Sequence, residues 1–289
     1  MDDTSPFFQL VNIAARVWGT FRQSLTATIG LSAVILLILT AIFAPYLAPY
    51  DPVEQELTRR TELPSADHLL GTDRLGRDIL SRIIVGTRLS LTMAVVAVAI
   101  GTTSGVTAGL VSGYAGGIVD NVLMRLVDIL LAFPLYILAI AIMAILGPSL
   151  VNMMIAVGIS SFPRFARLSR GEVRRLISLE YIEACRALGI PTVRVLFHHI
   201  LPNIANPVVV LATLRLGTAV LVESSLSFLG LGPPPPTPTW GLMVSDGLNV
   251  MRRAPFVSVF PGLAIMLLVL SFNLLGDGLR DALDPRTRD

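Results

Sequence analysis

Long uncharged stretches dominate the chain and alternate with short segments that carry most of its charge. No Asp, Glu, Lys or Arg occurs from Gln23 to Tyr50, from Leu89 to Val119, or from Ile129 to Pro163. A transmembrane helix needs about 20 mostly apolar residues, so each stretch is long enough to cross a bilayer. The dense apolar run Ile29–Leu47 also exceeds the apolar region of a signal peptide, which spans about 7–15 residues.

This pattern predicts an all-α membrane protein with six transmembrane helices. The 35 uncharged residues from Ile129 to Pro163 are fewer than the roughly 40 that two spans need. The third span is therefore expected to start near Val122 and to carry Arg125 and Asp128, which can pair at a spacing of three residues. The expected spans are Ile29–Leu47, Leu89–Val111, the helix from near Val122, Leu150–Arg167, Ile204–Val222 and Phe256–Leu275.

The arginines indicate an orientation for these spans. With the N-terminus inside, both termini are cytoplasmic, segments 50–88 and 223–255 lie outside, and segment 168–203 lies inside. Thirteen arginines then flank the spans on the inner side and eight on the outer side, which agrees with the positive-inside rule. The chain divides into an N-terminal tail, first span and external segment at 1–88, and a core of five spans at 89–289.

The segment between the fourth and fifth spans has the pattern of an amphipathic helix. Apolar residues recur at helical spacing from Gly171 to Leu188. Gly189 can end this helix, because glycine accepts the left-handed conformation common at helix C-termini. A second short helix is expected from about Thr192 to His199. Such a helical loop either lies on the lipid surface or fills a groove of a cytoplasmic partner.

Composition supports a membrane protein and excludes other classes. The 289 residues are 53% hydrophobic and 15% charged, with a mean hydropathy of +0.73. Soluble domains carry about 25% charged residues, which is more than this chain has. Disordered chains are much less hydrophobic than this one. The net charge of +2 gives no indication of nucleic-acid binding.

Residues suited to covalent or metal chemistry are scarce. All 22 basic residues are arginines, so the chain lacks the lysine of a P-loop. Cys185 is the single cysteine, and the three histidines are His68, His198 and His199. No zinc-protease or nucleophile-elbow motif occurs. We therefore expect no catalytic residues, metal site or cofactor in this chain, which excludes a membrane enzyme.

The helical loop resembles a known family. Glu183-Ala184-Cys185, then Gly189, then Leu201-Pro202 resembles the EAA loop of ABC importer permeases, with Cys185 in place of the second alanine and His199 where isoleucine is usual. In that family the loop is the coupling helix, seated in a cleft of the ATPase subunit. The residues that the resemblance implies for coupling are Tyr181, Ile182, Glu183, Ala184, Cys185, Arg186, Ala187, Leu188, Gly189, Leu201 and Pro202.

Other segments are similar to the peptide-type C-subunit branch of this family. They are Phe43–Tyr50, Leu70–Asp78, His199–Pro202, Ser227–Gly232, Pro238–Gly241 and Gly276–Arg286. The resemblance implies a type I importer permease in the bacterial inner membrane that moves dipeptides or oligopeptides, whereas relatives handle nickel complexes or glutathione. It also implies a homologous B-type permease, two ATP-binding subunits that hold ATP and magnesium, and an extracytoplasmic binding protein as partners.

An ion-coupled secondary carrier is the alternative function. Carriers use intramembrane charges and broken helices from inverted repeats. Here Arg215 lies within the fifth expected span and Glu223 at its outer end. Eight residues place them about 12 Å apart along a helix and about 80° around it. Both are candidates to line a substrate path, and Arg215 could instead pair with the partner permease.

Overall fold

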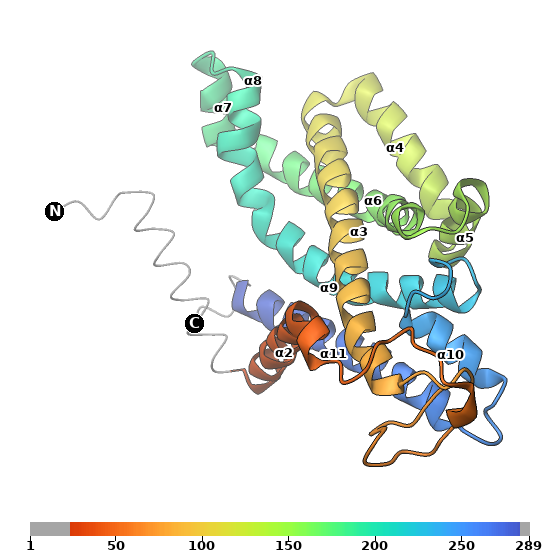
Figure 1. Cartoon of the computed structure of the whole chain (residues 1–289). Coiled ribbons are helices and arrows are strands. Elements are labelled where there is room, and N and C mark those ends of the chain that lie inside the picture. Colours follow the sequence, from red (N-terminus) through yellow and green to blue (C-terminus); the bar gives the residue numbers. More distant parts are fainter. Residues whose placement is uncertain (1–23, 284–289) are drawn as a thin grey trace.

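The computed structural model describes residues 24–283, and every regular element there is a helix apart from one isolated bridge between Thr72 and Asp78 (Figure 1). The N-terminal arginines and the last six residues, which include the end of the Gly276–Arg286 match, lie outside the described residues. The helices are α2 (Leu25–Leu47), η1 (Leu57–Arg59), α3 (Ile79–Ala115), α4 (Gly117–Ala132), α5 (Leu135–Leu146), α6 (Leu150–Ile177), α7 (Glu180–Ala187), α8 (Thr192–Arg194), η2 (Val195–Ile200), α9 (Leu201–Phe228), α10 (Trp240–Leu248) and α11 (Phe256–Leu283).

Four helical stretches are long and apolar enough to cross a membrane, and the bent pair α4–α5 is a fifth candidate. The four are α2, α3, the continuous stretch Thr192–Phe228 and α11. Helix α6, which covers the expected fourth span, is not among them, since its sequence includes Asn152, Arg164 and Arg167. The expected all-α architecture is confirmed for the described residues, and length and composition identify four or five candidate spans where six were expected.

The second expected span starts earlier than its uncharged run. Helix α3 begins at Ile79 rather than Leu89, and so runs through the expected boundary between residues 88 and 89. The charge of Arg82 is accommodated because its Nη1 donates to the carbonyl of Pro52 at 2.8 Å and its Nε lies 3.7 Å from Asp73 Oδ2. The guanidinium is fully buried, and among the described residues its Nε and Nη2 have no hydrogen-bond partner.

The expectation of one continuous third span is wrong. Helices α4 and α5 meet at 97° across Phe133 and Pro134. Pro134 cannot donate a backbone hydrogen bond and disfavours a helical conformation in the residue before it, and Phe133 is indeed extended, with φ −88° and ψ 135°. The expected pairing within this helix is also wrong, because Asp128 pairs with Arg167 of α6 at 2.5 Å.

The largest helix contact joins α3 to α6 through a stripe of small residues. Gly101, Gly105, Gly109 and Gly113 recur every fourth residue on α3, a spacing that lets helix backbones approach closely in membranes. A Cβ at Gly105 would lie 2.5 Å from Phe165 Cβ, and one at Gly109 would lie 2.6 Å from Ser169 Cβ. These two helices therefore form a close-packed unit that extends as far as the helical loop.

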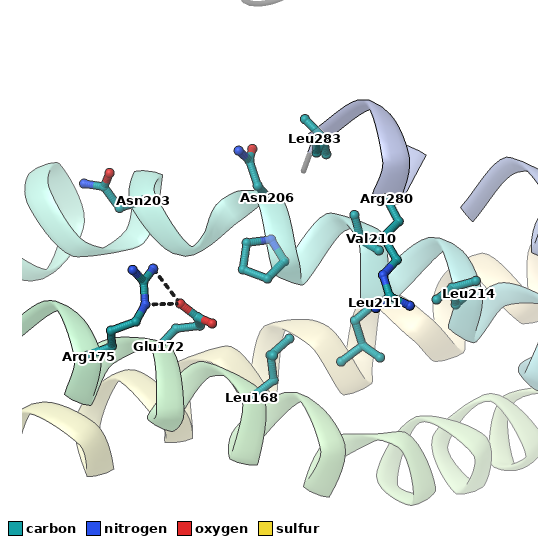
Figure 2. Close-up of a pocket in the computed structure, with 11 residues that line it drawn as sticks. Leu168, Glu172, Arg175, Asn203, Asn206, Val210, Leu211, Leu214, Arg280 and Leu283 are labelled. Atoms are coloured by element: carbon teal, nitrogen blue, oxygen red, sulfur yellow. Dashed lines mark hydrogen bonds and ion pairs between the residues drawn. The ribbon is translucent and has the colours of Figure 1, made fainter. Parts of the chain in front are cut away.

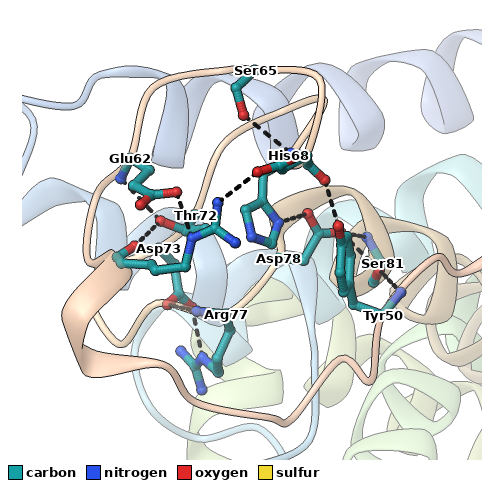
Figure 3. Close-up of polar contacts among 11 residues, drawn as sticks. Tyr50, Glu62, Ser65, His68, Thr72, Asp73, Arg77, Asp78 and Ser81 are labelled. Carbon is teal, nitrogen blue, oxygen red and sulfur yellow. Dashed lines mark hydrogen bonds and ion pairs between the residues drawn. The ribbon is translucent and has the colours of Figure 1, made fainter.

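The segment between α2 and α3 is held by buried ion pairs (Figure 3). His68 Nδ1 lies 2.9 Å from Asp78 Oδ1, while the other oxygen of Asp78 caps α3 by accepting from Ser81 N at 2.7 Å. Arg77 Nε lies 2.6 Å from Asp73, and Arg74 Nη2 lies 2.7 Å from Asp246 of α10. The start of α3 is thereby fastened to α10, at the end of the bundle opposite α7 and α8 (Figure 1).

Candidate functional site

The helical loop divides into two helices where one was expected. Helix α6 continues to Ile177, and α7 starts only at Glu180, so the expected helix Gly171–Leu188 is interrupted. Leu179 is extended, with φ −85° and ψ 140°, and its N–H bonds the carbonyl of Leu176 at 3.0 Å. The first half of the expected helix is therefore a rigid extension of α6, and only the second half is a separate element.

Gly189 ends α7 in the way that its sequence position predicts. Its φ is +71°, its N–H donates to the carbonyl of Arg186 at 3.0 Å, and Ile190 N–H donates to the carbonyl of Cys185 at 3.1 Å. These two bonds form a Schellman motif, and Cys185 and Ile190 pack together on one hydrophobic cluster. The expected turn after α7 is confirmed, and it returns the chain towards α8.

One residue of α7 anchors it to the bundle. Ile182 is fully buried in a cluster with Leu176 of α6, Val195 and Ile200 of η2, and others from α3 and α9. Arg186 adds a cation–π contact, with its Cζ 4.7 Å from the ring centre of Tyr114. The second expected helix is present as α8 and the π-helical η2, which continue directly into α9. The loop is thus packed against the ends of three long helices.

Several apolar side chains of the loop are exposed, with charged residues among them. Tyr181 is 42% exposed, Leu188 80%, Val193 66% and Phe197 56%. The other predicted coupling residues divide between a half-buried group, Cys185 and Leu201, and an exposed group, Glu183, Ala184, Arg186, Ala187, Gly189 and Pro202.

A groove of about 540 Å³, lined by both apolar and polar side chains, adjoins the loop between α6, α9 and α11 (Figure 2). Asn203 and Asn206 line it from α9, and Arg280 lines it from α11. On α6, Arg175 Nη2 lies 2.9 Å from Glu172, which leaves both side chains at the groove. The polar side chains of the groove and the exposed charged residues of the loop distinguish this end of the bundle from the apolar spans.

A buried carboxylate that the sequence analysis did not single out connects α4 to α6. Asp120 is 3% exposed and accepts hydrogen bonds from Ser112, Arg170 and Arg174. The signal was present in the sequence, because Asp120 lies three residues after Gly117 and is the first charge after the long uncharged run from Leu89 to Val119. Hydrogen bonds between α4 and α6 therefore lie close to the loop in the chain.

The two candidate path residues occupy different environments. Glu223 is 2% exposed and accepts hydrogen bonds from Ser90 of α3 at 3.2 Å and from Ser224 and Ser227 of α9 at 3.3 and 3.1 Å. This is a packed interface between helices. Arg215 is half-buried, and its Nε has no hydrogen-bond partner among the described residues. The structure therefore does not bring the two side chains together.

The described residues contain no group of three or more His, Cys, Asp or Glu side chains that could hold a metal. The loop consists of helices that present exposed apolar and charged residues. Its geometry suits docking and transmission of movement.

Comparison with protein families agrees with this description. The family described as "Binding-protein-dependent transport system inner membrane component" matches residues 105–289, which include the loop. A second family, "N-terminal TM domain of oligopeptide transport permease C", matches residues 13–64. The two matches together cover the first candidate span and most of the helical core.

Several curated bacterial proteins are similar over nearly the whole chain. The glutathione transport system permease protein GsiD of Escherichia coli O6:K15:H31 is 48% identical over 272 residues, which cover 94% of this chain and 90% of that protein. The proteins of the same name from Pectobacterium atrosepticum and Shigella dysenteriae serotype 1 are 48% and 49% identical, with the same coverage. These matches support an ABC importer permease and not the alternative function of an ion-coupled carrier. The chain therefore belongs to the family of binding-protein-dependent transport system inner membrane components, as an ABC importer permease subunit without an ATPase domain of its own.

Proposed function

We propose that this subunit imports small peptides of the glutathione class together with a homologous B-type permease. The observation that carries the proposal is the similarity to glutathione permeases along 94% of the chain. In the complete importer, two ATP-binding subunits would hold ATP and magnesium, and an extracytoplasmic binding protein would deliver the peptide. The chain would be a multi-pass protein of the bacterial inner membrane.

The proposed topology has six spans with both termini in the cytoplasm. Helix α6 would be the span that hydropathy alone does not identify, since it packs along α3 and pairs its arginines with Asp120 and Asp128. An intramembrane charge is tolerated when it faces a partner inside the bundle. The distribution of arginines supports the same orientation, with α7 inside and α10 outside.

Coupling to ATP hydrolysis would occur at α7. Its exposed residues Tyr181, Glu183 and Leu188 would contact a cleft of the ATPase subunit, while Ile182 fastens the helix to the bundle. A movement of the ATPase would then be transmitted through the α6 extension and through η2 into α9. Because ATP drives transport only if it favours one membrane conformation over another, a rigid connection at this point is required.

Glu223 has a supporting role in this proposal. Its hydrogen bond from Ser90 connects α9 to α3 near the end of the bundle that carries α10, while Ser224 and Ser227 of α9 itself donate to the same carboxylate. Arg215 is a separate case, because no described carboxylate neutralises it. The proposed path therefore includes Arg215, and Glu223 positions the helices beside it.

Uptake by the complete importer in proteoliposomes tests the proposed function. ATP-dependent uptake of glutathione should exceed that of a tripeptide of ordinary peptide linkage, a longer oligopeptide and a nickel complex. A complex whose ATPase subunits carry an inactivating substitution is the matched control. Preferential import of the nickel complex or of long peptides would contradict the proposed substrate class, and ATP-independent uptake would contradict the coupling.

A further inference from the structure

A groove of about 660 Å³ lies among α2, α3, α9 and α11, which are the helices long and apolar enough to cross a membrane. All but three of the residues that line it are apolar. The side chains of Ile38, Ile42 and Val95 are exposed there, so this chain leaves the groove open to its surroundings. On the surface of membrane-spanning helices, those surroundings are lipid or another subunit.

The polar residues of the groove differ in what they bind. Thr92 and Thr213 donate to backbone carbonyls of their own helices at 2.8 and 3.0 Å. Arg88, the one charged residue among those that line the groove, is exposed and forms no ion pair with any residue between positions 24 and 283. A cation in such apolar surroundings requires an anion from outside this chain.

The groove is short and Arg88 lies at one end of it. The backbone N–H of Tyr50 donates to Ser81 Oγ at 3.0 Å, which places the end of α2 beside the start of α3. At the other end the two backbones of α2 and α11 meet, because a Cβ at Gly30 would lie 2.6 Å from the backbone nitrogen of Leu275. The lining residues of α2 and of α3 each span eight positions, about 12 Å along the helix.

Arg88 also lies at the depth of lipid headgroups. It is the last charged residue before the uncharged run from Leu89 to Val119. Tyr46, in the last turn of α2, is 87% exposed, and tyrosine is enriched where a span meets the membrane surface. The groove, at about 12 Å, is shorter than half of the roughly 30 Å hydrocarbon core. An acyl chain of one leaflet would therefore fill it while its phosphate reached Arg88.

We propose that this groove holds one anionic phospholipid, with its phosphate on Arg88 and an acyl chain along the branched side chains of α2 and α3. On the proposed topology this lipid belongs to the outer leaflet. Helices pack on one another in membranes through small residues, and on α3 that stripe faces α6, whereas valine, isoleucine and leucine dominate the groove. Because acyl chains are as apolar as these walls, preference for one lipid over another comes from Arg88.

Native mass spectrometry of the complete importer tests the headgroup. The complex is purified in detergent and titrated with dioleoylphosphatidylglycerol or dioleoylphosphatidylcholine. One phosphatidylglycerol should bind about tenfold more tightly than phosphatidylcholine, and Arg88→Gln should remove this preference, since a hydrogen bond to a charged group commonly contributes about this much. Arg253→Gln, at an exposed arginine between α10 and α11, is the matched control and should keep the preference. An unchanged preference in Arg88→Gln would overturn the proposal.

A second pair of variants tests the apolar part of the site. Val95→Trp should fill the groove and remove one bound lipid of either kind, whereas Leu270→Trp, at an exposed residue of α11 outside the groove, should not. Glycerol phosphate, which has the anion without the chains, should not displace the lipid at equal concentration. Displacement by glycerol phosphate would show a simple anion site. Loss of the partner permease from either the Arg88→Gln or the Val95→Trp complex would show that this subunit covers the groove, and both results contradict a lipid site.

Discussion

Asp120 of α4 and Arg170 of α6 form a bidentate ion pair, with Nε donating to Oδ1 at 2.5 Å and Nη2 donating to Oδ2 at 2.6 Å. Arg174 also donates to Asp120 Oδ2 at 2.5 Å. Both arginines lie on the part of α6 that leads into the loop before α7. The pair therefore connects α4 to the end of α6, which leads into the helix α7 that is proposed to contact the ATPase.

Asp120→Asn should lower the stability of the permease and weaken its coupling. The substitution removes a buried carboxylate that accepts from two guanidinium groups, and hydrogen bonds to charged groups contribute about 1.5–3 kcal/mol. Thermal unfolding of the purified complex measures the loss. The matched control is Asp128→Asn, because the Asp128–Arg167 pair is 62% and 58% exposed and exposed pairs contribute only about 0–1 kcal/mol. Equal effects of the two substitutions would contradict the role of burial.

Glu183→Arg should abolish ATP-driven uptake and leave the protein inserted in the membrane. Glu183 is exposed on α7 and supports no described contact of the bundle, so the fold should tolerate the change. A helix docked in a protein groove depends on its charged contacts, whereas a helix on lipid would gain affinity for anionic headgroups. Uptake and co-purification of the ATPase subunits are the measurements. Normal uptake would contradict docking at this residue.

Gly189→Pro should also uncouple the permease, for a backbone reason. Proline fixes φ near −65° and has no N–H, whereas Gly189 has φ +71° and donates to the carbonyl of Arg186. The Schellman turn is then lost and α7 is misdirected. Gly171→Ala is the control, since a Cβ there meets nothing within 4 Å. ATPase activity that no longer responds to the binding protein, with an assembled complex, is the expected result.

Gly105→Val should disrupt the contact between α3 and α6. A Cβ at this position would lie 2.5 Å from Phe165 Cβ and 2.8 Å from the carbonyl oxygen of Phe162, so the two backbones must separate. Overpacking of this kind costs about 1–3 kcal/mol or more. Gly262→Val, at a helical glycine with open space around it, should unfold close to the wild-type temperature. A similar fall in both variants would show that valine itself, not the helix contact, is responsible.

Single-cysteine labelling tests the proposed topology. In a Cys185→Ser background, a cysteine at Thr237 should react with an impermeant thiol reagent added outside, because it lies in the segment between α9 and α10. A cysteine at Arg288 should react only after the membrane is opened. Denatured samples of both variants provide the control for total thiol. The reverse pattern would invert the orientation of every span.

The sequence by itself determined the helical membrane class, the expected start of α6, the end of α7 at Gly189 and the family, because these follow from local patterns. Hydropathy, a helix-ending glycine and a short motif depend on residues that are close together in the sequence, so they can be recognised without knowing the tertiary structure. The helix break at Pro134 was not predicted, because the apolar run around it favoured a continuous helix.

Only the tertiary structure decided how the charged residues are partnered. Arg82 is buried in α3 because the carbonyl of Pro52 and the carboxylate of Asp73 surround it. Asp128 pairs with Arg167 of α6, Asp120 accepts from two arginines of the same helix, and Arg215 Nε has no hydrogen-bond partner among the described residues. A charge in an apolar helix must find a partner, but the partner is set by which helices pack together. That packing depends on contacts between residues far apart in the chain, which no local pattern contains.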